Sequence, residues 1–326
     1  MGSFNGLWFT SGKALTIQQP PINRLMELGA VALMDFIFLD LSVGLFSNML
    51  ITFISCGAWR RGGHQSPADT ILLSLGLCNV LMQSLLICSI IIYHFWIQIF
   101  LSDHFFRWLY GVYTPITACS SWMTSWLCIF YCIKITTFQF RFFVWMKSRF
   151  CDALPWLIFT SIVLSFVVIS PLSANLSTSQ SCSSNTEWRS NAFLLVVETS
   201  EFLPIIVLWC CLPCLLIFMS LGLTMVSLVL HVLRMKKSSS FMDSQITAHV
   251  NSIKTMAFLL ALYVTFCSSQ LILLLNIFPF GSTEFWFFLL LNYSFCSLQG
   301  IILILGNPKL YNTLLKVYNF MKIIRI

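Results

Sequence analysis

Seven long apolar stretches, separated by more polar loops, constrain this chain more than any other feature. They cover residues 29–58, 70–93, 108–135, 154–172, 202–233, 250–278 and 285–306. Each is long enough to cross a hydrocarbon core of about 30 Å as a helix of about 20 residues. A chain in lipid must satisfy its own backbone hydrogen bonds, and helices do so. The sequence, in which 58% of the residues are hydrophobic, therefore predicts an all-α membrane protein built as a seven-transmembrane helix bundle.

The lysine and arginine residues of the loops predict the orientation of the bundle. If the spans alternate in direction, one side of the membrane holds Arg60, Arg61, Arg141, Lys147, Arg149, Arg234, Lys236, Lys237, Lys309, Lys316, Lys322 and Arg325. The other side holds Lys13, Arg24, Arg107 and Arg189. The positive-inside rule then places the N-terminus outside and the C-terminus in the cytosol, as in seven-helix receptors. The net charge of +7 is explained by topology, so we expect no nucleic-acid partner.

This topology divides the chain into three parts: an extracellular segment 1–28, a transmembrane domain 29–306 and a cytosolic end 307–326. Residues 1–26 show no apolar core followed by a small-residue cleavage site, so the first span is expected to act as the insertion signal. The C-terminal part has apolar residues at three- and four-residue steps, with basic residues mostly on its other faces. This pattern favours a short amphipathic eighth helix that lies on the membrane surface over a frayed tail. Membrane lipid is therefore an expected partner of the protein, and sterol is a candidate among the lipids. The apolar residues are Leu310, Leu314, Val317, Met321 and Ile324.

Polar residues within the first two spans form a second pattern. Asp40, Gly44 and Asn48 recur at four-residue spacing, which places them on one face of a helix. Asn79 in the second span is the expected partner of that face. Burying such groups is unfavourable, so they mark either packing or function. The pattern favours an interhelical hydrogen-bond network, and the alternative is a bound cation or a switch.

The cysteines and the glycosylation sequons agree with this topology. Most of the thirteen cysteines fall within spans, where thiols behave as small hydrophobic groups, and Cys182 is the one that lies clearly in an extracellular loop. The sequon at Asn175 follows the fourth span and is expected to carry a glycan outside the cell. The same triplet form at Asn292 falls within the seventh span and is expected to be inaccessible.

No catalytic or cofactor-binding pattern is present in the sequence. The five histidines lack the spacing of a zinc protease, and Cys210, Cys211 and Cys214 lie inside an apolar stretch where packing explains them better than zinc does. The chain has neither a glycine-rich phosphate loop nor a serine nucleophile elbow, and its seventh span has no lysine for retinal. We therefore expect no enzymatic activity, no metal and no cofactor.

The motifs at the cytosolic ends of the spans carry a family resemblance. The third span and the loop after it contain Ser121, Trp122, Phe130-Tyr131, Lys134-Ile135, Phe138, Trp145-Met146-Lys147 and Arg149. The fifth and sixth spans contribute Pro213, Ser227-Leu228, His231, Met235, Asp243, Ala248-His249-Val250, Lys254, Phe258 and Tyr263. The first loop and the tail add Trp59-Arg60-Arg61, Ser66-Pro67-Ala68-Asp69, Asn307 and Lys309-Leu310. Together these motifs resemble the type 2 bitter taste receptors, a branch of the G-protein-coupled receptors, over residues 40 to 315.

Two departures mark the chain as a divergent member of that family. The second span has Cys78-Asn79 where the family usually has Ser-Arg. The seventh span has Gln299-Gly300 where the family usually has His-Ser. A charge is therefore missing from the core, and Asp40 must be satisfied by hydrogen bonds or by protonation.

The resemblance implies a multi-pass receptor of the plasma membrane that binds small, largely apolar bitter compounds from outside. Pockets between the helices of a bundle are mostly aromatic and aliphatic, with a few polar groups. Helical spacing groups the candidate residues on shared faces, and the resemblance turns those faces toward the ligand. They are Tyr113, Thr117, Phe202, Ile206, Trp209, Tyr263, Phe266, Gln270, Leu289 and Asn292. Plain packing is the alternative for each of them.

Two of these candidates differ from the family in a way that bears on ligand charge. Tyr113 stands where the family often has Trp, and Leu289 stands where it sometimes has an acid. A cationic alkaloid would therefore lack its expected carboxylate, although Glu198 and Glu201 lie near the mouth.

The resemblance also implies activation of a heterotrimeric G protein of the gustducin/Gi class. The candidate coupling residues are basic: Lys134, Arg141, Lys147, Arg149, His231 and Lys254. The alternative is that these charges only anchor the topology. Two other functions stay open from the residues alone: a seven-span transporter, which would show saturable uptake, and a structural or chaperone-like membrane protein.

Overall fold

The computed structural model describes residues 21–60, 66–100, 102–136, 141–174, 176–179, 194–197, 199–235, 243–275, 277–278 and 282–324. Every predicted span is a helix, and each contains a segment that is apolar and long enough to cross a membrane. The predicted fold class is therefore confirmed. The spanning helices are α1 (Pro21–Arg60), α2 (Pro67–Phe95), α4 (Asp103–Ile135), α5 (Arg141–Ala174), α6 (Thr199–Met235), α7 (Asp243–Leu274) and α8 (Thr283–Gly306).

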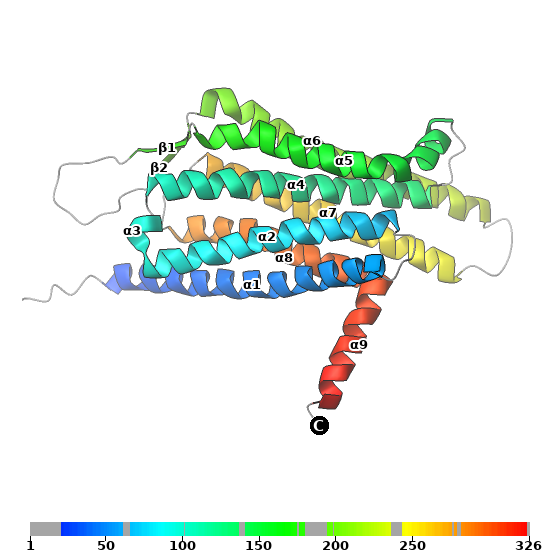
Figure 1. Cartoon of the computed structure of the whole chain (residues 1–326), viewed down its shortest axis with the longest axis horizontal. Coiled ribbons are helices and arrows are strands. Elements are labelled where there is room, and N and C mark those ends of the chain that lie inside the picture. The colour runs from blue at the N-terminus through cyan, green and yellow to red at the C-terminus, as the bar shows by residue number, and fades with distance from the viewer. Residues whose placement is uncertain are drawn as a thin grey trace, which may run out of the picture.

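Four smaller elements complete the described part of the chain. A short helix, α3 (Ile97–Phe100), joins α2 to α4. Strand β1 (Leu176–Ser179) pairs antiparallel with β2 (Leu194–Val197) after α5, with Leu176 opposite Val197. The sequence did not predict α3 or the strand pair, because each is far shorter than a span. The predicted eighth helix is present as α9 (Pro308–Ile324), which leaves the bundle at a steep angle to α8 (Figure 1).

Helix α4 lies at the centre of the bundle and contacts α2, α5, α6 and α7. Helix α1 packs against α2 and α8, and α7 packs against α6 and α8. The strand pair lies at the end of the bundle where α4 and α6 begin, and α9 lies at the opposite end (Figure 1). Large apolar side chains such as Phe53, Trp156 and Val167 point outward and are largely exposed, as the lipid-facing surface of a membrane protein requires.

Serine caps define where three of the helices begin. Ser66, Ser102 and Ser282 each accept a hydrogen bond from the backbone N–H three residues later, which satisfies one of the unpaired donors of a helix start. Helix α5 begins at Arg141, well before the predicted span at 154. Hydropathy detects the part of a helix that lies in lipid, and the charged first turns of α5 extend the helix beyond it.

A glycine allows α1 to approach its neighbours closely, as its position on the polar face predicted. A Cβ atom on Gly44 would overlap the side chains of Gln83 in α2 and Ser297 in α8. Small residues at such contacts let membrane helices pack backbone to backbone. The close approach brings the polar face of α1 against α2 and α8.

Candidate functional site

The centre of the bundle holds a network of neutral amide side chains from three helices. Asn79 Nδ2 donates to Asn48 Oδ1 at 3.0 Å and to Gln299 Oε1 at 2.8 Å. Asn48 Nδ2 in turn donates to the backbone carbonyls of Gly44 at 2.9 Å and Cys296 at 3.1 Å. All three amide side chains are fully buried. Asn79 is thus a partner of the α1 face, through Asn48.

Hydroxyl groups of α4 and α8 take part in this network as well. Ser120 Oγ donates to Asn79 Oδ1 at 2.7 Å, and Gln299 Nε2 donates to Thr124 Oγ1 at 2.6 Å. Gln83 Nε2 donates to Ser297 Oγ at 3.2 Å. The sequence did not single out Ser120 and Thr124, because serine and threonine are frequent along α4 and spacing alone does not show which helix they face.

Asp40 lies one turn from Gly44 on the same face of α1. Its backbone carbonyl accepts a hydrogen bond from Ser297 Oγ at 3.0 Å. Its side-chain Oδ2 is buried and has no hydrogen-bond partner within the described part of the chain. No group of His, Cys, Asp and Glu among the described residues is arranged to hold a metal ion.

A second polar cluster joins α4, α7 and α8 on the side of the network nearer the strand pair. Tyr113 donates through its hydroxyl to Asn292 Oδ1 at 3.0 Å. Asn292 Nδ2 donates to Gln270 Oε1 and, at 3.5 Å, to Ser269 Oγ. Asn292 is buried, as predicted for the sequon inside the seventh span. Three of the predicted ligand residues, from three helices, are therefore in direct contact.

Aromatic rings pack next to this polar cluster. The ring centroids of Phe266 and Phe295 lie 4.5 Å apart, and Tyr263 lies 5.9 Å from Phe295 with its ring nearly perpendicular. All three side chains are buried. The hydroxyl oxygen of Thr117, one turn after Tyr113, lies 3.1 Å from Met82 Sδ, so Thr117 faces α2. Leu289 is half-buried against the same core.

The remaining predicted ligand residues belong to the first half of α6. Phe202, Ile206 and Trp209 are helical, but their side chains lie outside the part of the chain whose side chains the structure describes. The predicted glycan site Asn175 and Cys182, which is predicted to lie in an extracellular loop, are also outside the described residues.

The predicted coupling residues belong to the end of the bundle that carries α9. Lys134 at the end of α4, Arg149 in the first turns of α5 and Lys254 in α7 are all exposed. The side chains of Arg141, Lys147 and His231 are outside the described set.

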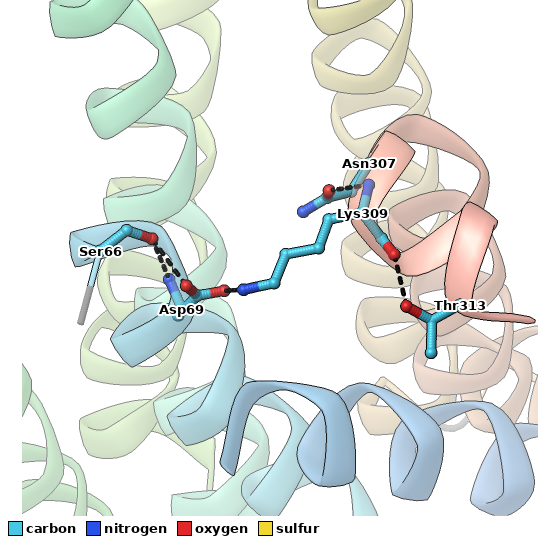
Figure 2. Close-up of polar contacts among 5 residues, drawn as sticks. All are labelled: Ser66, Asp69, Asn307, Lys309 and Thr313. Atoms are coloured by element: carbon cyan, nitrogen blue, oxygen red, sulfur yellow. Dashed lines mark hydrogen bonds and ion pairs between the residues drawn. The ribbon is translucent and has the colours of Figure 1, made fainter. Parts of the chain in front are cut away.

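An ion pair that the sequence did not predict fastens α9 to α2 at the same end. Lys309 Nζ lies 2.7 Å from Asp69 Oδ1, and the other carboxylate oxygen accepts from Ser66 Oγ at 2.9 Å (Figure 2). Asp69 N donates back to Ser66 Oγ at 3.2 Å, which makes Ser66 and Asp69 a reciprocal helix cap. On the α9 side, Lys309 N donates to Asn307 Oδ1 at 3.0 Å. The spacing of Ser66 and Asp69 is a signal that could have predicted the cap, whereas nothing in the sequence pairs Asp69 with Lys309.

Comparison with known proteins agrees with this architecture. The profile of the family described as taste receptor protein (TAS2R) matches residues 25–322. The chain is 25% identical to taste receptor type 2 member 40 of Gallus gallus, over 85% of this chain and 91% of that receptor. It is 28% identical to taste receptor type 2 member 41 of Rattus norvegicus, over 87% of this chain and 94% of that receptor. It is 24% identical to taste receptor type 2 member 5 of Papio hamadryas, over 90% of this chain and 96% of that receptor.

The family match covers all seven spanning helices and most of α9. The alignments with the individual receptors cover nearly the full length of each. This chain thus belongs to the taste receptor protein (TAS2R) family and is a multi-pass G-protein-coupled receptor of the plasma membrane that serves bitter taste, not an enzyme.

Proposed function

We propose that this receptor binds small, largely apolar bitter compounds between the outer halves of α4, α6, α7 and α8. The observation that supports this site is the hydrogen-bonded chain from Tyr113 through Asn292 to Gln270. It brings polar groups of three helices together beside a cluster of aromatic rings. Such a combination, a few convergent polar groups with apolar walls, is what small-molecule sites in helix bundles use. A ligand can replace part of this chain by offering its own donors and acceptors.

The proposed orientation puts this site on the outer side of the membrane and the basic helix ends in the cytosol. Residues 1–28 are then extracellular, Asn175 is exposed to glycosylation, and residues 307–326 are cytosolic. There the receptor activates a heterotrimeric G protein of the gustducin/Gi class. The exposed positions of Lys134, Arg149 and Lys254 support this proposal, because they leave positive charge on the surface that the G protein would meet.

Helix α9 is proposed to lie on the inner surface of the membrane. Leu310 is buried against the bundle, whereas Lys316 and Lys322 are exposed. A helix with apolar residues on one face and basic residues on another binds in the plane of an anionic lipid surface. Lipid, with sterol among the candidates, is therefore a proposed partner of this helix.

The proposal is tested by calcium mobilisation in cells supplied with a gustducin-type or chimeric G protein and a panel of bitter compounds. Phe266→Ala removes a buried ring worth about 1.5–3 kcal/mol of apolar contact, so it should lower agonist potency by roughly tenfold to a hundredfold. Trp209→Ala is expected to act in the same direction. Tyr263→Phe should instead change basal or maximal signalling, because an agonist shifts the equilibrium only by its differential affinity for the two states.

Phe258→Ala is the matched control for Phe266→Ala. Both residues belong to α7, but the side chain of Phe258 is 62% exposed on the surface of the bundle, whereas that of Phe266 is 3% exposed. Potency should survive Phe258→Ala after normalisation to surface expression. Equal effects of the two alanine variants would place the ligand elsewhere, and silence toward the whole panel would reject the proposed function.

A further inference from the structure

Two buried polar atoms on the outer half of α4, Arg107 Nε and Thr114 Oγ1, have no hydrogen-bond partner among the residues that the structure describes. Hydroxyls in a helix commonly donate to the carbonyl one turn earlier. Further along α4, Thr117 and Thr124 do so at 2.8 Å. Thr114 does not, although it has the same opportunity. A buried polar atom without a partner requires an explanation, and one explanation is a ligand.

The two side chains start from the same face of α4, and further along the helix that face is turned toward α6. Ser125 lies about five helical turns after Arg107 and about three turns after Thr114, so the three residues are nearly in line. Ser125 Oγ donates to the backbone carbonyl of Pro213 in α6 at 3.1 Å. Tyr113, by contrast, faces α8 through Asn292. Arg107 and Thr114 therefore border a different side of α4 from the polar cluster described above.

The level of the two residues also fits a ligand that enters from outside. Helices α4 and α6 begin at the same end of the bundle, next to the strand pair (Figure 1). Three turns before Pro213, α6 has reached Phe202, so Thr114 lies at about the level of the predicted ligand positions of α6. Arg107 is two turns nearer the mouth, about 10 Å further along the helix axis.

The chemistry of these groups indicates which ligands they select. An arginine side chain is always charged, offers only donors, and binds carboxylate or sulfonate groups in a bidentate manner. Among the described side chains, Arg107 takes part in no ion pair, since the one that they form joins Asp69 to Lys309 at the opposite end of the bundle. Partial burial strengthens the attraction between a cation and an incoming anion.

We propose that Arg107 and Thr114 form a subsite that selects ligands with an acidic group. Arg107 binds the carboxylate or sulfonate at the mouth, and the Thr114 hydroxyl bonds to a polar atom about 10 Å deeper in the ligand. This inference rests on the proposed function, because it assigns a ligand class to the same outer part of the bundle.

The experiment uses the full-length receptor in the calcium assay with matched pairs of aryl carboxylic acids and their methyl esters. For the wild type, acids should be more potent than esters. Arg107→Gln should lower acid potency by about tenfold or more and leave the esters nearly unchanged, since a hydrogen bond to a charged group contributes about 1.5–3 kcal/mol. Arg107→Lys keeps the charge without the bidentate geometry and should give an intermediate acid-to-ester ratio. Thr114→Val should lower acid and ester potency alike.

His104→Gln is the control, because His104 is an exposed residue of the same helix about one turn from Arg107. Its acid-to-ester ratio should equal that of the wild type. Equal shifts of acids and esters in Arg107→Gln would overturn the subsite and leave Arg107 as a topology anchor. If Arg107→Gln fails to reach the surface, a wild-type ratio in Arg107→Lys overturns it equally well. Responses to neutral compounds but to no acid would reject the subsite alone, whereas silence toward every compound would reject the proposed function.

Discussion

Asn79 uses one side-chain amide to connect four partners in the middle of the membrane. It donates to Asn48 and Gln299, and it accepts from Ser120 and from Cys296 Sγ. The network is held by neutral amides, so it needs no buried counter-charge. Because each partner is itself buried, the loss of one member leaves several polar groups unsatisfied.

Asn79→Ala should therefore lower the free energy of unfolding by about 1–3 kcal/mol, because Asn48, Gln299 and Ser120 would lose a partner away from water. The measurement is the thermal melting of the full-length receptor in detergent. Ser84→Ala serves as the control on the same helix, since Ser84 donates within α2 to the Val80 carbonyl at 2.8 Å. A melting temperature of Asn79→Ala equal to that of Ser84→Ala would contradict the prediction.

At this scale the sequence pattern named part of the network. Four-residue spacing predicted one face for Asp40, Gly44 and Asn48 with Asn79 as its partner, and in the structure Asn79 donates to Asn48. Spacing shows which residues of one helix share a face, but it does not show which neighbouring helix that face meets. Gln299 was therefore recognised only as a departure from the family, although it binds both Asn79 and Thr124.

At the scale of elements, the sequence predicted every spanning helix and α9, because lipid imposes length and apolarity on the former and amphipathicity on the latter. It missed the ends, such as the start of α5 at Arg141, and it missed β1 and β2. The ends of helices depend on caps and on contacts outside the membrane. Those contacts involve few residues and leave no periodic signal.

Helix α8 ends against α7 at a point where one glycine is required. A Cβ on Gly306 would lie 2.9 Å from Thr255 Cβ and nearer still to the rest of that side chain. Gly306→Ala should force the helices apart and lower the free energy of unfolding by about 1–3 kcal/mol. Gly222→Ala in α6, where an added Cβ meets nothing within 4 Å, is the control.

A double-mutant cycle in the same melting assay distinguishes a steric clash from a general effect of alanine. Thr255→Gly makes room for the added methyl group, so the double variant with Gly306→Ala should be more stable than the sum of the two single changes predicts. Strict additivity would show that Gly306 and Thr255 do not restrict each other.

The two residues of the Asp69–Lys309 ion pair, which joins α2 to α9, should contribute unequally to the free energy of unfolding. Lys309 is 46% exposed and Asp69 only 13%, and Asp69 also takes part in the cap with Ser66. Lys309→Ala should lower the free energy of unfolding by no more than about 1 kcal/mol, and less in high salt. Asp69→Ala should have the larger effect, because it also removes the carboxylate oxygen that accepts a hydrogen bond from Ser66 Oγ. The check is thermal melting at two ionic strengths, and a larger effect of Lys309→Ala would contradict it.

At the scale of the whole molecule, α4 connects the two proposed working ends. It carries Tyr113 toward one end and Lys134 at the other, and it contacts four of the other spanning helices. Neutralising Lys147 and Arg149 together should reduce maximal signalling while surface expression and ligand binding stay unchanged. The reason is that the receptor would lose part of the positively charged surface that the G protein contacts. Calcium mobilisation normalised to surface label measures this. Unchanged potency and maximal response would mean that these charges only set the topology.

Asn307 is the one residue between α8 and α9, so a change in the direction of α8 is passed on to α9. Its 17 residues extend about 25 Å from that joint. A tilt of α8 by roughly 10° would swing the far tip of a rigid α9 by about 4 Å. A fluorophore near Lys322 would therefore report movements of the seventh span that are too small to detect at Asn307 itself. The Asp69–Lys309 ion pair would oppose these movements.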